Sequence, residues 1–125
     1  MTNRMMKGKN KDSKYKNKPV TVDNIRFPSQ KEAFRYKELC LLQKAGKIKS
    51  LALQVPYILI PAQYAMVDGK KKCIERSVKY LADFVYYDAE TEQWIVEDAK
   101  GVRTKEYVLK RKLMLQVHNI RIHEV

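Results

Sequence analysis

Cysteine, glycine and proline are all scarce in this sequence. Its 125 residues include only two cysteines, Cys40 and Cys73, which lie far apart, with no Cys-x-x-Cys pair and no nearby pair of histidines. These absences argue against a disulfide framework and against a zinc site. We therefore expect both cysteines to be small buried side chains in a reducing compartment.

Long apolar runs are also missing. The longest, Leu51 to Ala62, is interrupted by Gln54, Pro56 and Pro61, and it is well short of the ~20 residues that span a bilayer. The first residues are basic and polar and lack the apolar centre of a secretory signal. The sequence thus predicts no membrane span and a cytoplasmic location.

Acidic residues are few in relation to basic ones. The chain has 26 Lys and Arg against 14 Asp and Glu, a formal net charge of +12, and 45% of its residues are hydrophobic. Such a chain has room for one globular core, which excludes a two-domain enzyme. The excess positive charge indicates a polyanionic partner, either nucleic acid or an anionic membrane surface.

Half of the net charge lies in residues 1–18, which contain seven basic residues and one acidic residue. This segment has almost nothing to bury, so we expect a disordered basic arm that contacts phosphates, including Lys14, Lys16 and Lys18. A solubilising tail is the alternative. Residues 19–125 are predicted to form a single domain.

The pattern Ser29-Gln30-Lys31-Glu32 predicts a capped helix that continues to Lys44. Tyr36 and Leu39 lie four and seven residues after Glu32, so Glu32 shares the stripe that faces the core.

Strand and turn patterns follow. We expect a hairpin or edge strand at 21–27, strands at 49–60, 72–87 and 93–100, a turn at Asp68-Gly69-Lys70, a helix from Thr104 to about Val117, and a short last strand at 120–124. Pro56 suggests an edge or a bulge. Leu109, Leu113 and Val117 are expected to face inward from the second helix. The prediction is an α/β fold with a small mixed sheet flanked by helices, in the order helix, three strands, helix, strand.

Acidic residues interrupt the two central strands. Asp98 and Lys100 are two residues apart and therefore project from one face, whereas Glu97 points away. If the turn at 88–92 closes a hairpin, Asp83 and Asp98 are cross-strand neighbours.

Two adjacent carboxylates repel each other and need a cation. Mg²⁺, with Mn²⁺ as a substitute, would suit Asp83, Asp98 and the backbone carbonyl of Ala99, and Lys100 could orient or deprotonate an attacking water. The alternative is a structural group of ion pairs at the sheet margin.

Four segments in this order resemble the PD-(D/E)XK nuclease superfamily, and more closely a small phage family related to archaeal-type Holliday junction resolvases. They are Phe27 to Ala33, Leu53-Gln54, Ala82-Asp83-Phe84 and Val96 to Gly101. The resemblance covers roughly residues 20–125 and implies a restriction-endonuclease-like core.

The resemblance also implies roles for individual residues. Asp83 would be the first metal ligand, Asp98 the (D/E) of the motif and Lys100 its lysine, while Glu32 would match the glutamate that completes the metal site. Ala82 replaces the proline of the name. Glu32 is also explained by helix capping alone.

Two further positions stay open. Gln54 resembles a family glutamine, although a sheet-edge hydrogen bond explains it equally well. Glu97 is a second acidic residue beside Asp98, but strand alternation favours Asp98.

Basic residues follow the motif. Arg103, Lys105, Lys110 and Arg111 could grip phosphates beside the scissile bond. A solvated basic face is the alternative, and for Lys110 an ion pair with Glu106.

Together these features predict a metal-dependent, structure-selective DNA endonuclease, resembling a phage Holliday junction resolvase in the cytoplasm of a bacterial host. A four-way junction has two-fold symmetry, so we expect a homodimer. A membrane partner and a small-molecule substrate are not expected. The alternatives are a nuclease-like module that binds nucleic acid without cutting it, and a nuclease that acts on forks, flaps or duplex DNA.

Overall fold

The computed structural model of the chain describes residues 18–99 and 102–125. Most of the expected basic arm, with Lys14 and Lys16, lies outside the described residues, and so does Lys100. Lys18 is described and exposed.

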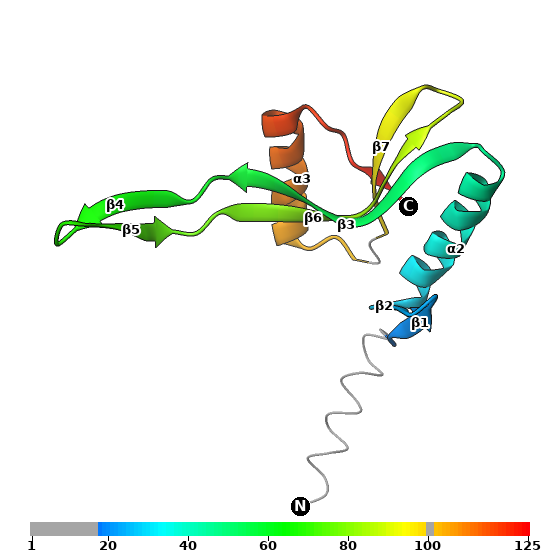
Figure 1. The fold of residues 1–125 in the computed structure, drawn as a ribbon, viewed down its shortest axis with the longest axis horizontal. Helices are drawn as coiled ribbons and strands as arrows, with labels where there is room; N and C mark the ends of the chain where they lie inside the picture. Colours follow the sequence, from blue (N-terminus) through cyan, green and yellow to red (C-terminus); the bar gives the residue numbers. More distant parts are fainter. Residues whose placement is uncertain (1–17, 100–101) are drawn as a thin grey trace, which may run out of the picture.

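The described chain is a mixed α/β structure with one main sheet and two helices (Figure 1). In the main sheet the strand order is β3-β6-β7-β8, with β3, β6 and β7 antiparallel and β8 parallel to β7. The elements are β1 Val20–Val22, β2 Ile25–Phe27, α2 Gln30–Lys44, β3 Ile48–Ile60, β4 Gln63–Val67, β5 Lys70–Glu75, β6 Val78–Asp88, β7 Gln93–Asp98, α3 Lys105–His118 and β8 His123–Glu124. A mixed sheet flanked by helices is therefore confirmed, although the structure has more strands than the sequence predicted.

The helix α2 begins and ends where its sequence pattern predicts. The Ser29 hydroxyl accepts a hydrogen bond from the Glu32 N–H at 3.2 Å, which caps the first turn. Glu32, Tyr36 and Leu39 are all buried, as expected from the helical stripe. Before α2, the segment predicted as a hairpin or edge strand forms the β1–β2 hairpin, and Phe27 packs its ring 5.0 Å from that of Tyr36.

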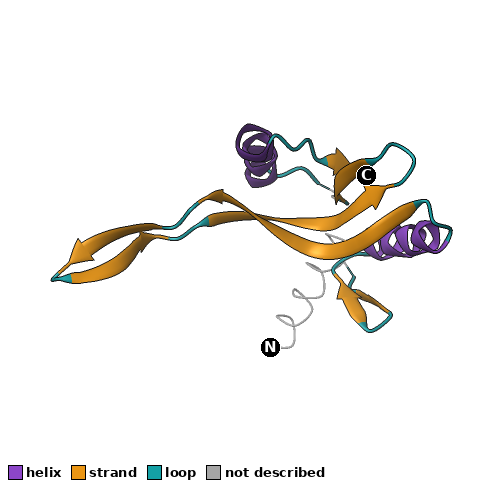
Figure 2. Cartoon of the chain, turned by 45° about the horizontal axis from the view of Figure 1, so that its top comes forward, coloured by secondary structure: helices purple, strands orange, loops and turns teal. Residues whose placement is uncertain are grey.

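The strand predicted at 72–87 is in fact two strands in different sheets. The ladder between β3 and β6 ends at Ile60 and Val78, and beyond it β4 and β5 pair only with each other. Pro61 follows Ile60 and has no N–H to continue the ladder, which explains the break. The predicted turn at Asp68-Gly69 is confirmed, and both residues have positive φ angles, 52° and 75°, as a type I′ hairpin turn requires. This β4–β5 hairpin projects from the body of the molecule (Figures 1 and 2).

The second helix, α3, is capped by Thr104 as predicted, but its buried face differs from the prediction. Leu109 and Val117, expected to face inward, are 58% and 49% exposed, and only Leu113 is partly buried. The buried residues are Tyr107 and Met114. The apolar residues of α3 are distributed around the whole helix, so their spacing alone does not predict which side packs on the sheet.

The two helices lie on opposite sides of the main sheet (Figure 2), and an apolar cluster lies beneath each of them. The cluster with α2 includes Phe84 and Tyr86, and the cluster with α3 includes Tyr80 and Val96. The cysteines are not in either buried set, contrary to the prediction. Cys40 is half-buried on α2 and Cys73 is exposed on β5.

No helix in the described part of the chain is long and apolar enough to cross a membrane. The edge position predicted for Pro56 is confirmed, because β3 is the first strand of the main sheet.

Candidate functional site

The ladder between β6 and β7 brings Asp83 and Asp98 to the same place in the sheet. Its last paired residues are Phe84 and Glu97, so Asp83 and Asp98 are the next residues on their strands. The backbone N–H of Ala99 donates a 2.9 Å hydrogen bond to Asp83 Oδ2. The Asp83 carboxylate thus lies against the backbone immediately after Asp98.

Along the long strand β6, alternate side chains face α3 before Asp83 and face α2 after it. Ala82 packs in the cluster of α3 and Phe84 in the cluster of α2, although two residues spaced by two share a face in a regular strand. On β3, Leu53 pairs with Phe84 and Val55 pairs with Ala82, so Gln54 lies opposite Asp83. The φ angle of Gln54 is 52°. A non-glycine residue in this region marks a local distortion of the strand. The candidate site therefore sits at the twist in the β3–β6 pair.

The side-chain amide of Gln54 joins two of the predicted acids. Its Nε2 atom lies 3.4 Å from Glu32 Oε2 and 3.4 Å from Asp83 Oδ1. Glu32 is 6% exposed and comes from the first turn of α2. Gln54 is thus more than a sheet-edge residue, since its amide separates two carboxylates that would otherwise repel each other.

Asp98 is completely buried, and its Oδ2 atom accepts a 2.5 Å hydrogen bond from the Tyr80 hydroxyl. The pKa of Tyr80 is raised far above its usual value, first by burial, then by the hydrogen bond and the charge of Asp98, with smaller effects from Tyr107 and Asp83. The Asp98 carboxylate thus lies against Tyr80, which belongs to the cluster beneath α3. Tyr80 was not predicted to belong to the site, because its only signal in the sequence is its place in an aromatic strand.

Glu97 is also completely buried, but it faces α2 and its charge is neutralised there. Arg35 donates from Nε to Glu97 Oε1 at 2.6 Å and from Nη2 to Oε2 at 2.7 Å, and the Tyr86 hydroxyl donates to Oε2 at 2.5 Å. The paired carboxylate raises the pKa of Arg35. Glu97 therefore points away from Asp98, as strand alternation predicts. Its partner Arg35 was not predicted, because it lies 62 residues away along the chain.

The basic residues predicted to contact phosphates near α3 are largely engaged within the chain. Arg103 and Arg111 pair with Glu124 at 2.6 and 3.2 Å, and Tyr107 donates a hydrogen bond to the same carboxylate. These contacts lower the pKa of Glu124. Other predicted phosphate contacts, Lys18 and Lys105, are exposed.

Lys110 pairs with Glu106 at 3.1 Å, one helical turn away. This is the structural alternative that the sequence left open for that lysine. It also lines a hollow with Tyr80 and Tyr107 on the α3 side of the sheet.

The comparison with protein families decides where this chain belongs. Its residues 12–125 match the model of a family described as a protein of unknown function (DUF1064). The chain belongs to this family. No curated protein and no solved structure matched it.

The donor atoms of the site are of the kind that Mg²⁺ prefers, because Asp83, Asp98 and the Ala99 carbonyl all offer oxygen. Within residues 18–99 and 102–125 there is no group of three or more His, Cys, Asp or Glu side chains close enough to hold a metal. Glu32 instead reaches Asp83 through the amide of Gln54. Among the described residues, Asp83 and Asp98 are therefore the neighbouring acids that such an ion could use together with water, and Glu32 is linked to Asp83 through Gln54.

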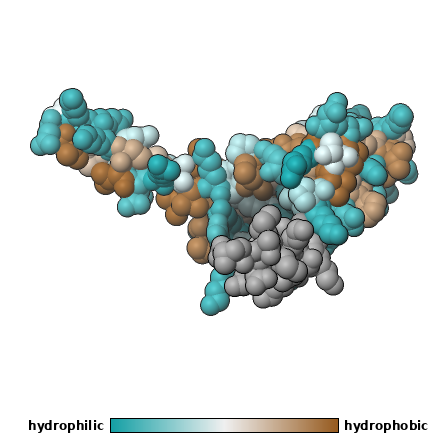
Figure 3. Space-filling model, turned by 90° about the horizontal axis from the view of Figure 1, so that it is seen from below, coloured by the Kyte–Doolittle hydropathy of each residue, from teal (hydrophilic) through white to brown (hydrophobic). Residues whose placement is uncertain are grey.

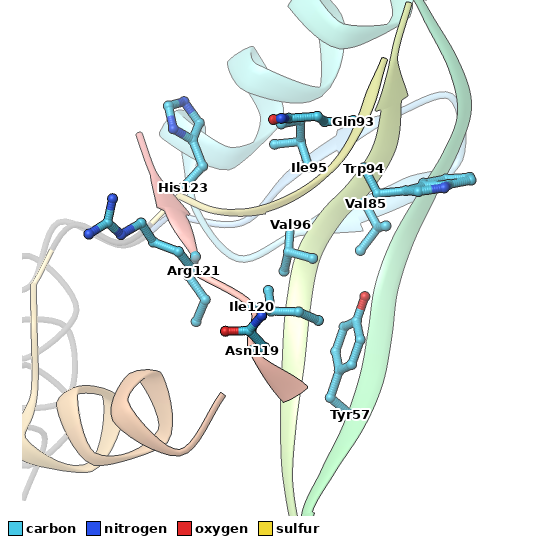
Figure 4. Close-up of a pocket in the computed structure, with 11 residues that line it drawn as sticks. Tyr57, Val85, Gln93, Trp94, Ile95, Val96, Asn119, Ile120, Arg121 and His123 are labelled. Carbon is cyan, nitrogen blue, oxygen red and sulfur yellow. The ribbon is translucent and has the colours of Figure 1, made fainter. Parts of the chain in front are cut away.

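A separate hollow lies between β7 and the segment that joins α3 to β8 (Figure 4). Its lining includes Tyr57, Trp94 and Ile120, and none of the candidate acids. It opens on a different part of the sheet from the aspartates and adds nothing to their chemistry.

Proposed function

We propose that this protein is a metal-dependent DNA endonuclease that selects branched DNA and resolves four-way junctions. One observation carries the proposal: Asp83 accepts a hydrogen bond from the Ala99 N–H, directly after Asp98, whereas the competing acid, Glu97, is already neutralised by Arg35. A cation bound between neighbouring carboxylates would offset the cost of burying their charge.

The order of the elements supports this proposal. If the β1–β2 and β4–β5 hairpins are set aside, the remaining order is α2, β3, β6, β7, α3, β8. This is helix, three strands, helix, strand, the order expected of a restriction-endonuclease-like core. Kinship with the PD-(D/E)XK nucleases, and with the archaeal-type resolvases among them, is accordingly part of the proposal.

The chemistry follows from the donor set. Bound Mg²⁺, or Mn²⁺, would supply a water of lowered pKa close to a DNA phosphate. Asp83 and Asp98 would hold the ion, and the Ala99 N–H and the Tyr80 hydroxyl fix the direction of their carboxylates. Glu32, held by Gln54, would accept a hydrogen bond from a water on the side of α2. Lys100 follows Asp98 by two residues, as the motif requires, and would stabilise charge on the phosphate.

The substrate class follows from charge and symmetry. A net charge of +12 favours a polyanion. A four-way junction needs two cuts related by a two-fold axis, so the active form would be a homodimer with one site per subunit.

The decisive experiment is Asp83→Asn. Asparagine keeps an oxygen that accepts the Ala99 N–H but removes the negative charge, so the fold should survive and the cation site should not. We expect loss of cleavage by at least about 10²-fold, with junction affinity in chelator unchanged or increased. Cleavage is measured on labelled junction, fork, flap and duplex DNA of matched sequence, with Mg²⁺, Mn²⁺ or chelator.

Lys79→Gln provides a matched control, since Lys79 is an exposed residue on the same strand. It should cut the junction at a rate close to that of the wild type. Equal cleavage by wild type and Asp83→Asn would disprove the assignment of the site. If the wild type binds every DNA but cuts none of them with either metal, the protein is a non-cleaving binding module, and if it cuts duplex as fast as junction, it is not a resolvase.

A further inference from the structure

The β4–β5 hairpin has a composition and a position that the nuclease site does not explain. It contacts chiefly itself, since β4 and β5 form a separate two-stranded sheet. All six residues of β5 are exposed. An isolated two-stranded hairpin is only marginally stable in water, so such an arm is expected to work against a partner.

The cations of this hairpin are available, in contrast to those of α3. Lys70, Lys71 and Lys72 are consecutive on β5, and Arg76 follows. In the described part of the chain, no ion pair involves a cation of the hairpin, whereas Arg103, Lys110 and Arg111 at α3 are all paired. The nitrogen of Lys71 instead lies 4.7 Å from the centre of the Tyr64 ring, where it keeps its charge.

The end of the arm is hydrophilic, and apolar side chains lie behind it (Figure 3). Tyr64, Met66 and Ile74 are 54%, 68% and 55% exposed. A two-stranded ribbon of this kind fits a DNA groove, with lysines on the phosphates and the aromatic or apolar side chains against sugars and bases.

The hairpin lies far from the aspartates. From Gln54, beside Asp83, the chain runs along the extended ribbon for eleven residues to Ala65 and thirteen to Val67, which pair with Lys72 and Lys70. At the rise of a β-strand this is roughly 36–43 Å. One turn of B-form DNA measures about 35 Å. The lysines of the arm are therefore about one helical turn of DNA away from a phosphate bound at Asp83.

We propose that the β4–β5 hairpin is a DNA-binding arm that grips the phosphate backbone about one helical turn from the cleavage site. This inference rests on the proposed function for the identity of the partner, DNA, and adds a second contact region to it. The positive charge of β5 favours DNA over a second copy of the chain, because two such hairpins would repel each other.

The test replaces Lys70, Lys71 and Lys72 together with glutamine. A matched variant, Lys44→Gln with Lys47→Gln and Lys49→Gln, removes three exposed positive charges at the opposite end of β3. Both are made in the Asp83→Asn background and studied in chelator, so that the DNA stays intact. Binding to junctions with arms of about 8 and about 25 base pairs is measured by fluorescence anisotropy over a range of salt concentrations.

On long arms we expect the hairpin variant to bind at least about tenfold more weakly than the control. The slope of log K against log salt should become shallower by about 0.9 for each phosphate that the hairpin no longer neutralises. On short arms the two variants should bind alike, because the tip has no DNA to reach. Circular dichroism should give the same melting temperature for both.

Equal binding of the two variants to long arms would overturn the inference, and so would a hairpin variant that is weakened as much on short arms as on long ones. Unchanged DNA binding combined with a change from dimer to monomer in Met66→Ser with Ile74→Ser would assign the hairpin to subunit contact instead. The outcome is independent of cleavage. If the wild type cuts no DNA but the hairpin variant loses affinity for long arms, the proposed function fails and the DNA-binding arm stands.

Discussion

Glu97 and Asp98 are adjacent on β7 and equally inaccessible to solvent, but one has a charged partner and the other a neutral one. Glu97 is held by the guanidinium of Arg35, whereas Asp98 is held by the neutral hydroxyl of Tyr80 and lies beside Asp83. An acid that is already paired with arginine has little to offer a metal ion. The two residues can therefore be distinguished experimentally.

Asp98→Asn should abolish metal-dependent cleavage, while Glu97→Gln should retain it. Glu97→Gln should nevertheless lower the free energy of unfolding by about 2–3 kcal/mol, because it leaves the Arg35 charge without its partner. This is less than the full cost of breaking a buried pair, since the Arg35 side chain is 21% exposed. Urea unfolding and junction cleavage are the two measurements.

Removing both charges, in Arg35→Met with Glu97→Gln, should restore most of that stability, because glutamine keeps an oxygen for the Tyr86 hydroxyl. Loss of cleavage in Glu97→Gln at a temperature where the variant is fully folded, with activity kept in Asp98→Asn, would mean that the motif acid has been assigned to the wrong residue.

The sequence was sufficient to separate these acids but not to find their partners. Strand alternation placed Asp98 and Glu97 on opposite faces, and the hairpin register placed Asp83 beside Asp98. Arg35 comes from a helix distant in sequence, and its contact with Glu97 depends on how α2 packs on the sheet. The link between Glu32 and Asp83 depends on the distorted backbone at Gln54, which no residue pattern indicated.

At the scale of the elements, α3 shows how packing selects one face among several apolar ones. Tyr107 and Met114 are buried against the sheet, and the ring of Tyr107 lies 6.4 Å from that of Tyr80. Leu109 is exposed although it fits a helical stripe with Leu113. Burial, and not hydrophobicity alone, should therefore determine the effect of substitution.

Met114→Ala should lower the free energy of unfolding by about 2–4 kcal/mol, because it leaves a cavity in the cluster beneath α3. Leu109→Ala, which removes a side chain that is 58% exposed, should change it by less than about 0.5 kcal/mol. Denaturant unfolding of both variants checks the difference. A larger effect at Leu109 would mean that the exposed side of α3 is covered in solution, for example by another subunit.

The strand predicted at 72–87 shows a second limit of sequence reasoning. β5 and β6 carry a nearly continuous strand pattern, and only the identity of their partners separates them. β5 pairs with β4 and β6 pairs with β3 and β7. The local sequence pattern predicts that a segment is extended, but it does not predict which strand the segment pairs with, because pairing depends on contacts along the whole ladder.

At the scale of the whole molecule, the proposed resolution of a two-fold junction requires two sites acting in one complex. Each chain contributes one pair of aspartates, so the two cuts would depend on two subunits. Mixed dimers offer a way to count the sites.

Wild-type chains co-expressed with Asp83→Asn chains and purified through two different tags should nick a cruciform plasmid on one strand and not linearise it. Each mixed dimer would contain a single working site. Gel electrophoresis separates the nicked from the linear product, and a wild-type dimer carrying both tags is the control. Linear product from the mixed dimers at the control rate would show that one subunit makes both cuts.

The separation of the β4–β5 hairpin from the rest of the fold also has an evolutionary consequence. Ile60 and Val78 face each other across the last rung of the β3–β6 ladder, so the chain between them can be shortened or extended without moving the aspartates. Two residues added to each of β4 and β5 would keep every other side chain on the same face of the hairpin and lengthen the hairpin by about 7 Å. Insertions and deletions in this segment are thus a route by which descendants of one ancestor could change the length of the hairpin while inheriting an unchanged pair of aspartates.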